Sequence, residues 1–169
     1  MGMKLKSILV ALLLVIGVGM KASENLSNAQ ALFIYNFLRH IKWPESATSD
    51  NFIIGVYGNS ETFDQLVNYT KGRMVGTKSI VVKRISSVNE AKGCQLVFVP
   101  YDKSNKISEL KDGLGNSPCL LVSEKEGMNP NGSTIEFVIQ DDKLKFRINE
   151  TRAKQQNLIF SKALIDMAV

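Results

Sequence analysis

Few side chains in this sequence are of a type and spacing that do chemistry. His40 is the single histidine, and Cys94 and Cys119 are too far apart in sequence for the C-x-x-C pair of a zinc site. There is no G-x-S-x-G elbow, no H-E-x-x-H motif and no P-loop. The carboxylates stand singly, apart from Asp141 and Asp142, which suit a turn. We therefore predict no catalytic residues, no metal and no cofactor, and expect that the protein is not an enzyme.

Four residues are placed to bind a small ligand: Gly58, Asn59, Ser60 and Asp102. The first three follow the apolar run Phe52–Tyr57, and Asp102 follows the run that ends at Val99. Ligands of open α/β sheets bind at the carboxyl ends of such strands. These residues predict a ligand crevice, and the alternative is that Ser60 and Asp102 only cap helices.

Cys94 and Cys119 each open a short apolar run. If the two runs are neighbouring parallel strands in register, their Cα atoms lie about 5 Å apart, within disulfide range. In an oxidising compartment an even pair of cysteines is interpreted first as a disulfide. The alternative is two buried, reduced thiols packed as small hydrophobic side chains.

Two groups of residues are candidates for binding a partner protein. Lys145 and Arg147 alternate with core positions and form a cationic strip, although the same charges also protect an edge strand from unwanted pairing. Asn36, His40 and Trp43 lie near the end of the first predicted helix, where an aromatic residue is a common interface anchor. Capping of the core by Trp43 is the alternative.

The stretch Ala31–Pro44 predicts the first core helix. Its apolar side is broad enough to need a sheet as its partner and consists of Phe33, Ile34, Phe37, Leu38 and Ile41. Pro44 keeps the residue before it out of the helical region, so the helix should finish near Lys42 with the Trp43 indole at its mouth.

Strands and helices alternate through the rest of the chain. Strands are predicted at Phe52–Tyr57, Ile80–Ile85, Cys94–Val99 and Cys119–Ser123, and helices after Ser60 and over Lys103–Leu114. Thr134–Gln140 and Lys143–Asn149 alternate as a hairpin across Asp141 and Asp142, and Thr151–Ala168 is helical with a break at Asn157. This order predicts a three-layer α/β sandwich: a mixed, mostly parallel sheet of about six strands, helices on both faces, and a closing C-terminal hairpin and helix.

Residues 1–23 have the layout of a cleavable signal peptide, with Lys4 and Lys6 before an apolar run at 8–18 and small residues after it. That run is shorter than the roughly 20 residues that span a bilayer. We predict export to the periplasm and one domain over residues 24–169, and an uncleaved amino-terminal anchor is the alternative.

The leader also accounts for most of the apparent basicity. Residues 1–23 hold three of the 21 basic residues and none of the 16 acidic ones, which leaves a net charge of +2. Such a balance has no electrostatic footprint for a phosphate backbone, so nucleic-acid binding is excluded.

Taken in order, these segments resemble the YfiR-like family of exported bacterial regulators, related to YfiR and HmsC. The resemblance begins at Ile41-Lys-Trp-Pro44 and continues through Ile53–Gly58, Gly93–Val99 and Leu120–Ser123. It is strongest in Leu144–Asn149 followed by Ala153, Leu158, Ser161 and Leu164. It covers nearly the whole mature chain.

The resemblance implies a periplasmic regulator. The namesake type restrains an inner-membrane diguanylate cyclase by contacting its periplasmic part, is relieved by an outer-membrane lipoprotein, and responds to redox state through disulfides; related domains occur with sensor kinases. We therefore expect a repressor that binds a membrane-bound signalling receptor, with an outer-membrane lipoprotein and a second copy of the chain as further candidate partners. The alternative is a periplasmic sensory module that binds a small molecule.

Overall fold

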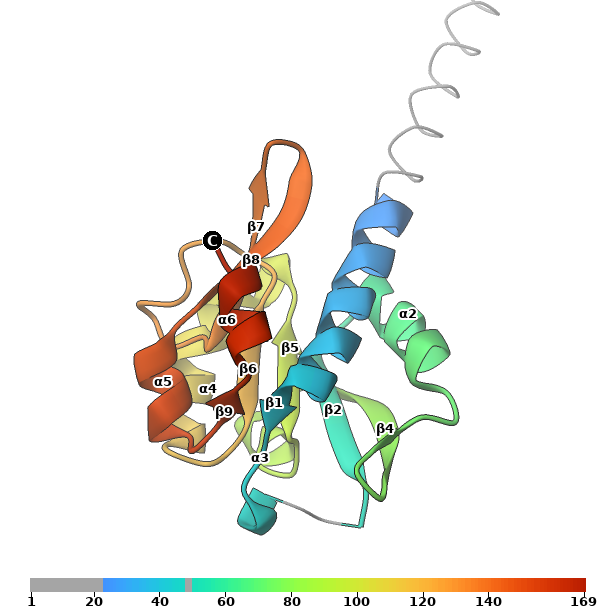
Figure 1. Ribbon diagram of the computed structural model, residues 1–169, viewed down its shortest axis with the longest axis vertical. Helices are drawn as coiled ribbons and strands as arrows, with labels where there is room; N and C mark the ends of the chain where they lie inside the picture. Colours follow the sequence, from blue (N-terminus) through green and yellow to red (C-terminus); the bar gives the residue numbers. More distant parts are fainter. Residues whose placement is uncertain (1–22, 48–49) are drawn as a thin grey trace, which may run out of the picture.

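A seven-stranded mixed sheet lies at the centre of the protein (Figure 1). The structure, a computed structural model, describes residues 23–47 and 50–169, so the predicted leader lies outside the described residues except for Ser23. In spatial order the strands are β3 (Met74–Val75), β4 (Lys78–Ile85), β2 (Phe52–Tyr57), β5 (Leu96–Val99), β6 (Leu120–Ser123), β7 (Ile135–Gln140) and β8 (Lys143–Ile148). The strands from β4 to β7 are parallel, and β3 and β8 are antiparallel edges.

Helices cover both faces of the sheet, which confirms the three-layer α/β prediction. One face packs against the N-terminal helix (residues 23–40), α2 (Glu61–Thr70) and α6 (Lys162–Met167). The other packs against α3 (Val88–Ala91) and α4 (Ile107–Leu114), which follows the 3₁₀ turn η2 (Tyr101–Lys106). The sheet has one strand more than the roughly six predicted, because β3 spans only two residues and is too short to show a periodicity.

The predicted apolar side of the N-terminal helix packs on the sheet and on the hairpin. Ile34, Phe37 and Leu38 are buried, and Phe33 is half-buried against the same core. The Phe37 ring meets Phe146 edge-on, with 5.0 Å between the ring centroids. Contacts of this kind add about 0.5–1.5 kcal/mol beyond the area that they bury.

The helix ends earlier than predicted, at His40 rather than near Lys42. Ile41 and Lys42 form β1, which pairs antiparallel with β9 (Ile159–Phe160). The predicted end relied on Pro44, but the backbone leaves the helix before that residue because it pairs with a distant strand. A short 3₁₀ turn, η1 (Glu45–Ala47), follows.

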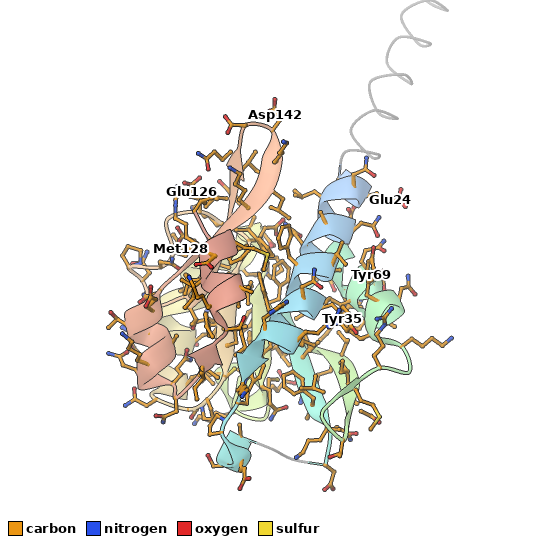
Figure 2. All side chains as sticks on the ribbon, in the orientation of Figure 1. Glu24, Tyr35, Tyr69, Glu126, Met128 and Asp142 are labelled. Atoms are coloured by element: carbon orange, nitrogen blue, oxygen red, sulfur yellow. The ribbon has the colours of Figure 1, made fainter. Side chains whose placement is uncertain are left out.

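The C-terminal hairpin has the predicted register. Ile135 lies opposite Ile148, Phe137 opposite Phe146, and Ile139 opposite Leu144. Asp141 and Asp142 both adopt positive φ (53° and 57°), as the two-residue turn that suits the twist of paired strands requires. The hairpin extends beyond the end of the sheet beside the start of the N-terminal helix, with Asp142 at its tip (Figure 2).

The C-terminal segment breaks where the sequence indicated. The helix α5 (Glu150–Gln155) ends before Asn157, whose φ of 55° is in the left-handed region. The two-residue strand β9 and α6 follow. Leu158 and Leu164 are buried against the main core, whereas Ile165 is 39% exposed.

Candidate functional site

A cavity of about 260 Å³ lies at the carboxyl ends of β2, β5 and β6. The chain leaves β2 into α2 on one face of the sheet and leaves β5 into α4 on the other, so the ends of these neighbouring strands diverge. Open α/β sheets bind ligands at such a point. Asn59 and Ser60 line the cavity from the loop after β2, and Tyr101 and Asp102 line it from the turn after β5.

A buried polar chain forms one wall of this cavity. Thr62 Oγ1 donates to Gln30 Oε1 at 2.8 Å, and Gln30 Nε2 donates to Glu124 Oε1 at 2.9 Å. The second oxygen of Glu124 accepts from the backbone N–H of Tyr101 at 2.8 Å. The network thereby joins the N-terminal helix, α2 and the ends of β5 and β6, which holds the cavity in one shape.

A second cavity, of about 240 Å³, adjoins the first and is mainly apolar. It lies between the start of the N-terminal helix and the β7–β8 hairpin, and it shares Leu26, Gln30, Tyr101 and Glu124 with the first cavity. Its own walls are Glu126, Phe137, Val138, Ile139 and Leu144. We call the two adjoining cavities the edge groove.

A separate, mainly apolar hollow of about 250 Å³ lies at the opposite end of the N-terminal helix, between α5, β9 and α6. Leu158, Ile159, Phe160 and Ile165 line it together with three residues of α5, which are Glu150, Ala153 and Lys154. Ile159 is 66% exposed and Ile165 is 39% exposed. We call Leu158, Ile159, Phe160 and Ile165 the C-terminal apolar surface.

The family model for YfiR/HmsC-like proteins matches residues 27–169 of this chain. The chain belongs to the YfiR/HmsC-like family. No curated protein matches the chain significantly. The matched residues include the whole C-terminal apolar surface and all lining residues of the edge groove except Ser23 and Leu26. Both sites are therefore parts of this YfiR/HmsC-like domain.

Three of the four residues predicted to form a ligand crevice line the edge groove of this YfiR/HmsC-like domain, and ligand binding by them stays a prediction. Asn59, Ser60 and Asp102 line the edge groove, whereas Gly58 is not among the lining residues. Gly58 instead makes the turn that ends β2, at φ 73°, and a Cβ there would lie 3.2 Å from Lys103 Cε. Sequence reasoning missed Leu26, Gln30 and Glu124.

The residues predicted near the end of the first helix contact different parts of the fold. Trp43 Nε1 donates to the backbone oxygen of Gln95 at 3.0 Å, and its ring packs edge-on against Phe52 at 4.9 Å. His40 Nδ1 lies 3.1 Å from Ser161 Oγ, and Asn36 is half-buried on the helix. Trp43 therefore caps the core, which was the alternative interpretation, and a partner-binding role for the three stays a prediction.

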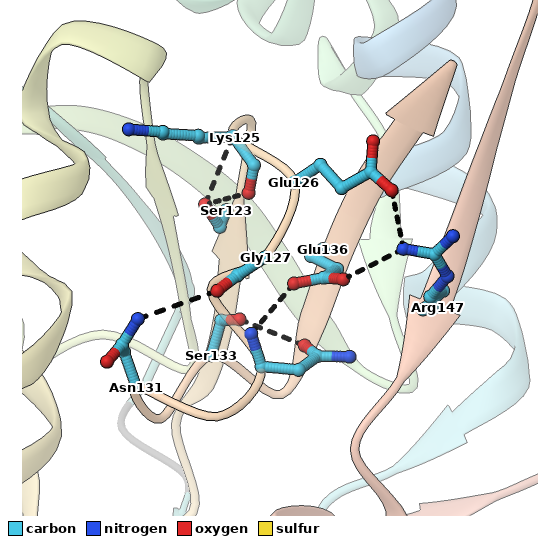
Figure 3. Close-up of polar contacts among 9 residues, drawn as sticks. Ser123, Lys125, Glu126, Gly127, Asn131, Ser133, Glu136 and Arg147 are labelled. Carbon is cyan, nitrogen blue, oxygen red and sulfur yellow. Dashed lines mark hydrogen bonds and ion pairs between the residues drawn. The ribbon is translucent and has the colours of Figure 1, made fainter. Parts of the chain in front are cut away.

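One of the two charges of the predicted cationic strip, that of Arg147, is paired with carboxylates within the domain (Figure 3). Arg147 Nη1 lies 2.6 Å from Glu126 Oε1 and 3.5 Å from Glu136 Oε1. Glu136 is buried and also accepts from the backbone N–H of Asn129 at 2.7 Å, which fixes the loop before β7. Lys145 Nζ donates to Gln140 Oε1. These bonds favour the structural interpretation of the strip, and partner binding by Lys145 and Arg147 stays a prediction.

Both cysteines are free and buried in the structure. β5 and β6 are neighbouring parallel strands, as the disulfide argument required, but Leu96 pairs with Leu120. This register sets Gln95, and not Cys94, opposite Cys119. Burial raises the pKa of the Cys94 thiol to about 11 and raises the pKa of Cys119 as well. The structure therefore has the reduced, packed pair that was the alternative.

Two kinds of site are missing from the part of the chain that the structure describes. No three side chains of histidine, cysteine, aspartate or glutamate come together there as metal ligands. Every helix within the described ranges is too short or too polar to cross a bilayer.

Proposed function

We propose that this protein is an exported regulator that binds a membrane signalling protein and holds it inactive. Its membership of the YfiR/HmsC-like family supports a regulatory role in cyclic-di-GMP signalling. The regulated protein is a membrane-bound receptor with a diguanylate cyclase or sensor kinase output. A regulator of this kind acts by binding one conformation of its target better than the other.

The observation that carries the proposal is the C-terminal apolar surface. Soluble proteins rarely leave clustered apolar side chains around a hollow unless a partner covers them. Ile159 and Ile165 project at the rim, and Leu158 and Phe160 form the floor beneath them. Aliphatic and aromatic side chains in a hollow are suited to receive an apolar anchor from the receptor.

A second protein that covers the same surface would release the receptor. An outer-membrane lipoprotein fits this role if the domain is exported, because both proteins would then share the periplasm. Export depends on the leader at residues 1–23, and amino-terminal sequencing of the protein recovered from the periplasm checks whether the leader is cleaved. Recovery of intact protein from the cytosol would contradict export.

The decisive experiment measures cyclic-di-GMP in cells and binding in vitro. A strain lacking the gene is complemented with the wild type, Ile159→Glu or Val81→Glu. Val81 is 40% exposed on β4, away from the C-terminal apolar surface, and serves as the matched control. We expect the deletion and Ile159→Glu to raise cyclic-di-GMP several-fold and Val81→Glu to restore the wild-type level.

The binding measurement uses the periplasmic region of the membrane receptor that is captured with this protein from solubilised membranes. Ile159→Glu should weaken its association with the purified domain by at least about tenfold, since the interface would lose an apolar contact and would have to desolvate a charge. Full repression by Ile159→Glu at wild-type abundance would refute a role for this surface.

A second candidate function is a small-molecule sensor that uses the edge groove. The observation that favours it is the groove itself, a shaped cavity at the switch point of the sheet with a fully hydrogen-bonded polar wall. The two functions are compatible, because the edge groove and the C-terminal apolar surface share no lining residue.

A further inference from the structure

Among the residues that the structure describes, the lining of the edge groove has acidic side chains and no basic ones. One cation near its rim is Lys125, whose Nζ lies 5.3 Å from the centroid of the Tyr101 ring. Glu61 and Asp102 line the first cavity, Glu126 lines the second, and Glu124 lines both. A smaller hollow that shares Ser27 and Glu61 with the first cavity of the edge groove adds Glu24 and Asp64, and its described lining has no basic side chain. This one-sided charge contrasts with the chain as a whole, which is slightly basic even without its leader.

Two of the four carboxylates in the groove form ion pairs with basic residues that do not line it, and the other two form none. Lys103 Nζ lies 2.6 Å from Asp102 Oδ2, and Arg147 Nη1 lies 2.6 Å from Glu126 Oε1. Glu61 accepts a hydrogen bond from the Ser23 hydroxyl at 2.6 Å, and Glu124 accepts only from neutral donors. Within the described ranges, no ion pair is formed by Glu61 or Glu124, so these two carboxylates keep their negative charge uncompensated in the groove.

The apolar half of the groove lies directly beside this charge. Phe137 and Val138 are buried beneath it, whereas Ile139 is 58% exposed and Tyr101 is 61% exposed at its rims. Glu124 stands where the two cavities meet. A ligand that covers both cavities thus needs a positive group and an apolar group joined by a short link.

We propose that the edge groove binds a small amphipathic cation, with an ammonium or guanidinium group against Glu124, Glu61 and Asp102 and an apolar group over Phe137 and Ile139. This inference rests on the second candidate function, the small-molecule sensor. Cavities of about 260 and 240 Å³ together lie in the range of small-molecule sites. The groove repels carboxylates and phosphates and gives a bare cation no apolar contact.

The test is a matched series of probes titrated into the exported, leader-cleaved protein by calorimetry. 4-Phenylbutylamine carries both the charge and the ring, 4-phenylbutyrate reverses the charge, and butylamine lacks the ring. We expect 4-phenylbutylamine to bind at least about tenfold more tightly than either of the other two, because only it uses both halves of the groove. Equal binding of 4-phenylbutyrate would overturn the proposal, and so would no binding of 4-phenylbutylamine at millimolar concentration.

Variants assign the binding to the groove. Glu124→Gln should weaken the binding of 4-phenylbutylamine about tenfold. Glu109 is an exposed residue of α4 on the other face of the sheet, so Glu109→Gln should leave that affinity unchanged. Because Glu124 also holds the backbone of Tyr101, the double variant Glu61→Gln with Asp102→Asn repeats the test with exposed side chains. Unchanged affinity in both the single and the double variant would refute the assignment.

The apolar half has its own variant, Ile139→Ser. It should weaken the binding of 4-phenylbutylamine and leave the affinity for butylamine unchanged. An equal loss of affinity for both probes would contradict an apolar subsite. Ile159→Glu is expected to bind 4-phenylbutylamine as the wild type does. Failure of the probes therefore overturns the ligand class alone, whereas full repression by Ile159→Glu overturns the receptor-binding surface alone.

Discussion

The side-chain amide of Gln30 donates to the carboxylate of Glu124 across 2.9 Å, and this bond joins the N-terminal helix to the end of β6. Gln30 is 1% exposed and accepts in turn from Thr62 Oγ1. One buried amide thus satisfies two partners on different elements. The packing of the N-terminal helix over the edge groove depends on it.

Replacing Gln30 by leucine should destabilise the domain by about 1–3 kcal/mol, because Thr62 and Glu124 each lose a buried partner. Adding Thr62→Val should recover part of the loss, since the orphaned hydroxyl is removed as well. Urea unfolding of the wild type, the single variant and the double variant measures both effects. A Gln30→Leu variant as stable as the wild type would contradict this account of the wall.

Arg147→Ala should lower the free energy of unfolding of the domain more than Lys145→Ala does. The two residues alternate on one strand, but only Arg147 faces the buried carboxylate of Glu136. Lys145 makes one exposed hydrogen bond to Gln140. Chemical denaturation of the two variants side by side checks the difference, and equal losses would show that the Glu136 pair contributes nothing.

Gly55→Ala should destabilise the domain by about 1–3 kcal/mol through overpacking. A Cβ at this position in β2 would lie 2.9 Å from Cys94 Sγ and 3.0 Å from Ile85 Cδ1. Cys94→Ala removes the sulfur, so the double variant should lose less than the sum of the single variants. A double-mutant cycle from thermal or urea unfolding measures this coupling, and strict additivity would refute the contact.

The buried thiols should make stability fall at alkaline pH. Burial raises the pKa of Cys94 from 9.0 to about 11, so the folded state keeps its proton where the unfolded chain releases it. This stabilisation is fully present below pH 9 and is lost as the pH rises toward 11. Cys119 acts in the same direction.

Lysine and tyrosine residues also titrate in this range, so the measurement compares the wild type with the double variant Cys94→Ala, Cys119→Ala. Between pH 8 and 10.5 the free energy of unfolding of the wild type should fall more steeply than that of the double variant. Parallel curves over that range would show that neither thiol differs in pKa between the folded and unfolded states.

The sequence predicts those features of the fold that depend on neighbouring residues. The hairpin register follows from alternation around Asp141 and Asp142, and the break at Asn157 follows from its tolerance of positive φ. The crevice at Asn59, Ser60 and Asp102 follows from the rule that strand ends share an edge. In each case a local pattern is sufficient.

Features set by distant contacts were missed or misplaced. β1 and β9 have two residues each, too few to show a period, and the register between β5 and β6 is decided by packing across the whole sheet. The sequence contained one sign that Gln30 is buried, because this residue lies one helical turn before Ile34 and so falls on the buried side of the helix. A polar residue in that position indicates a buried hydrogen-bonding partner, although not which one.

The pairing of β1 with β9 places the two candidate binding surfaces at opposite ends of a single rod. The described part of the N-terminal helix runs from Ser23, at the edge groove, to His40, whose backbone oxygen accepts from Ser161 directly after β9. At about 1.5 Å per residue that rod is about 27 Å long. The two candidate binding surfaces are thus joined by one continuous helix as well as by the sheet on which that helix packs.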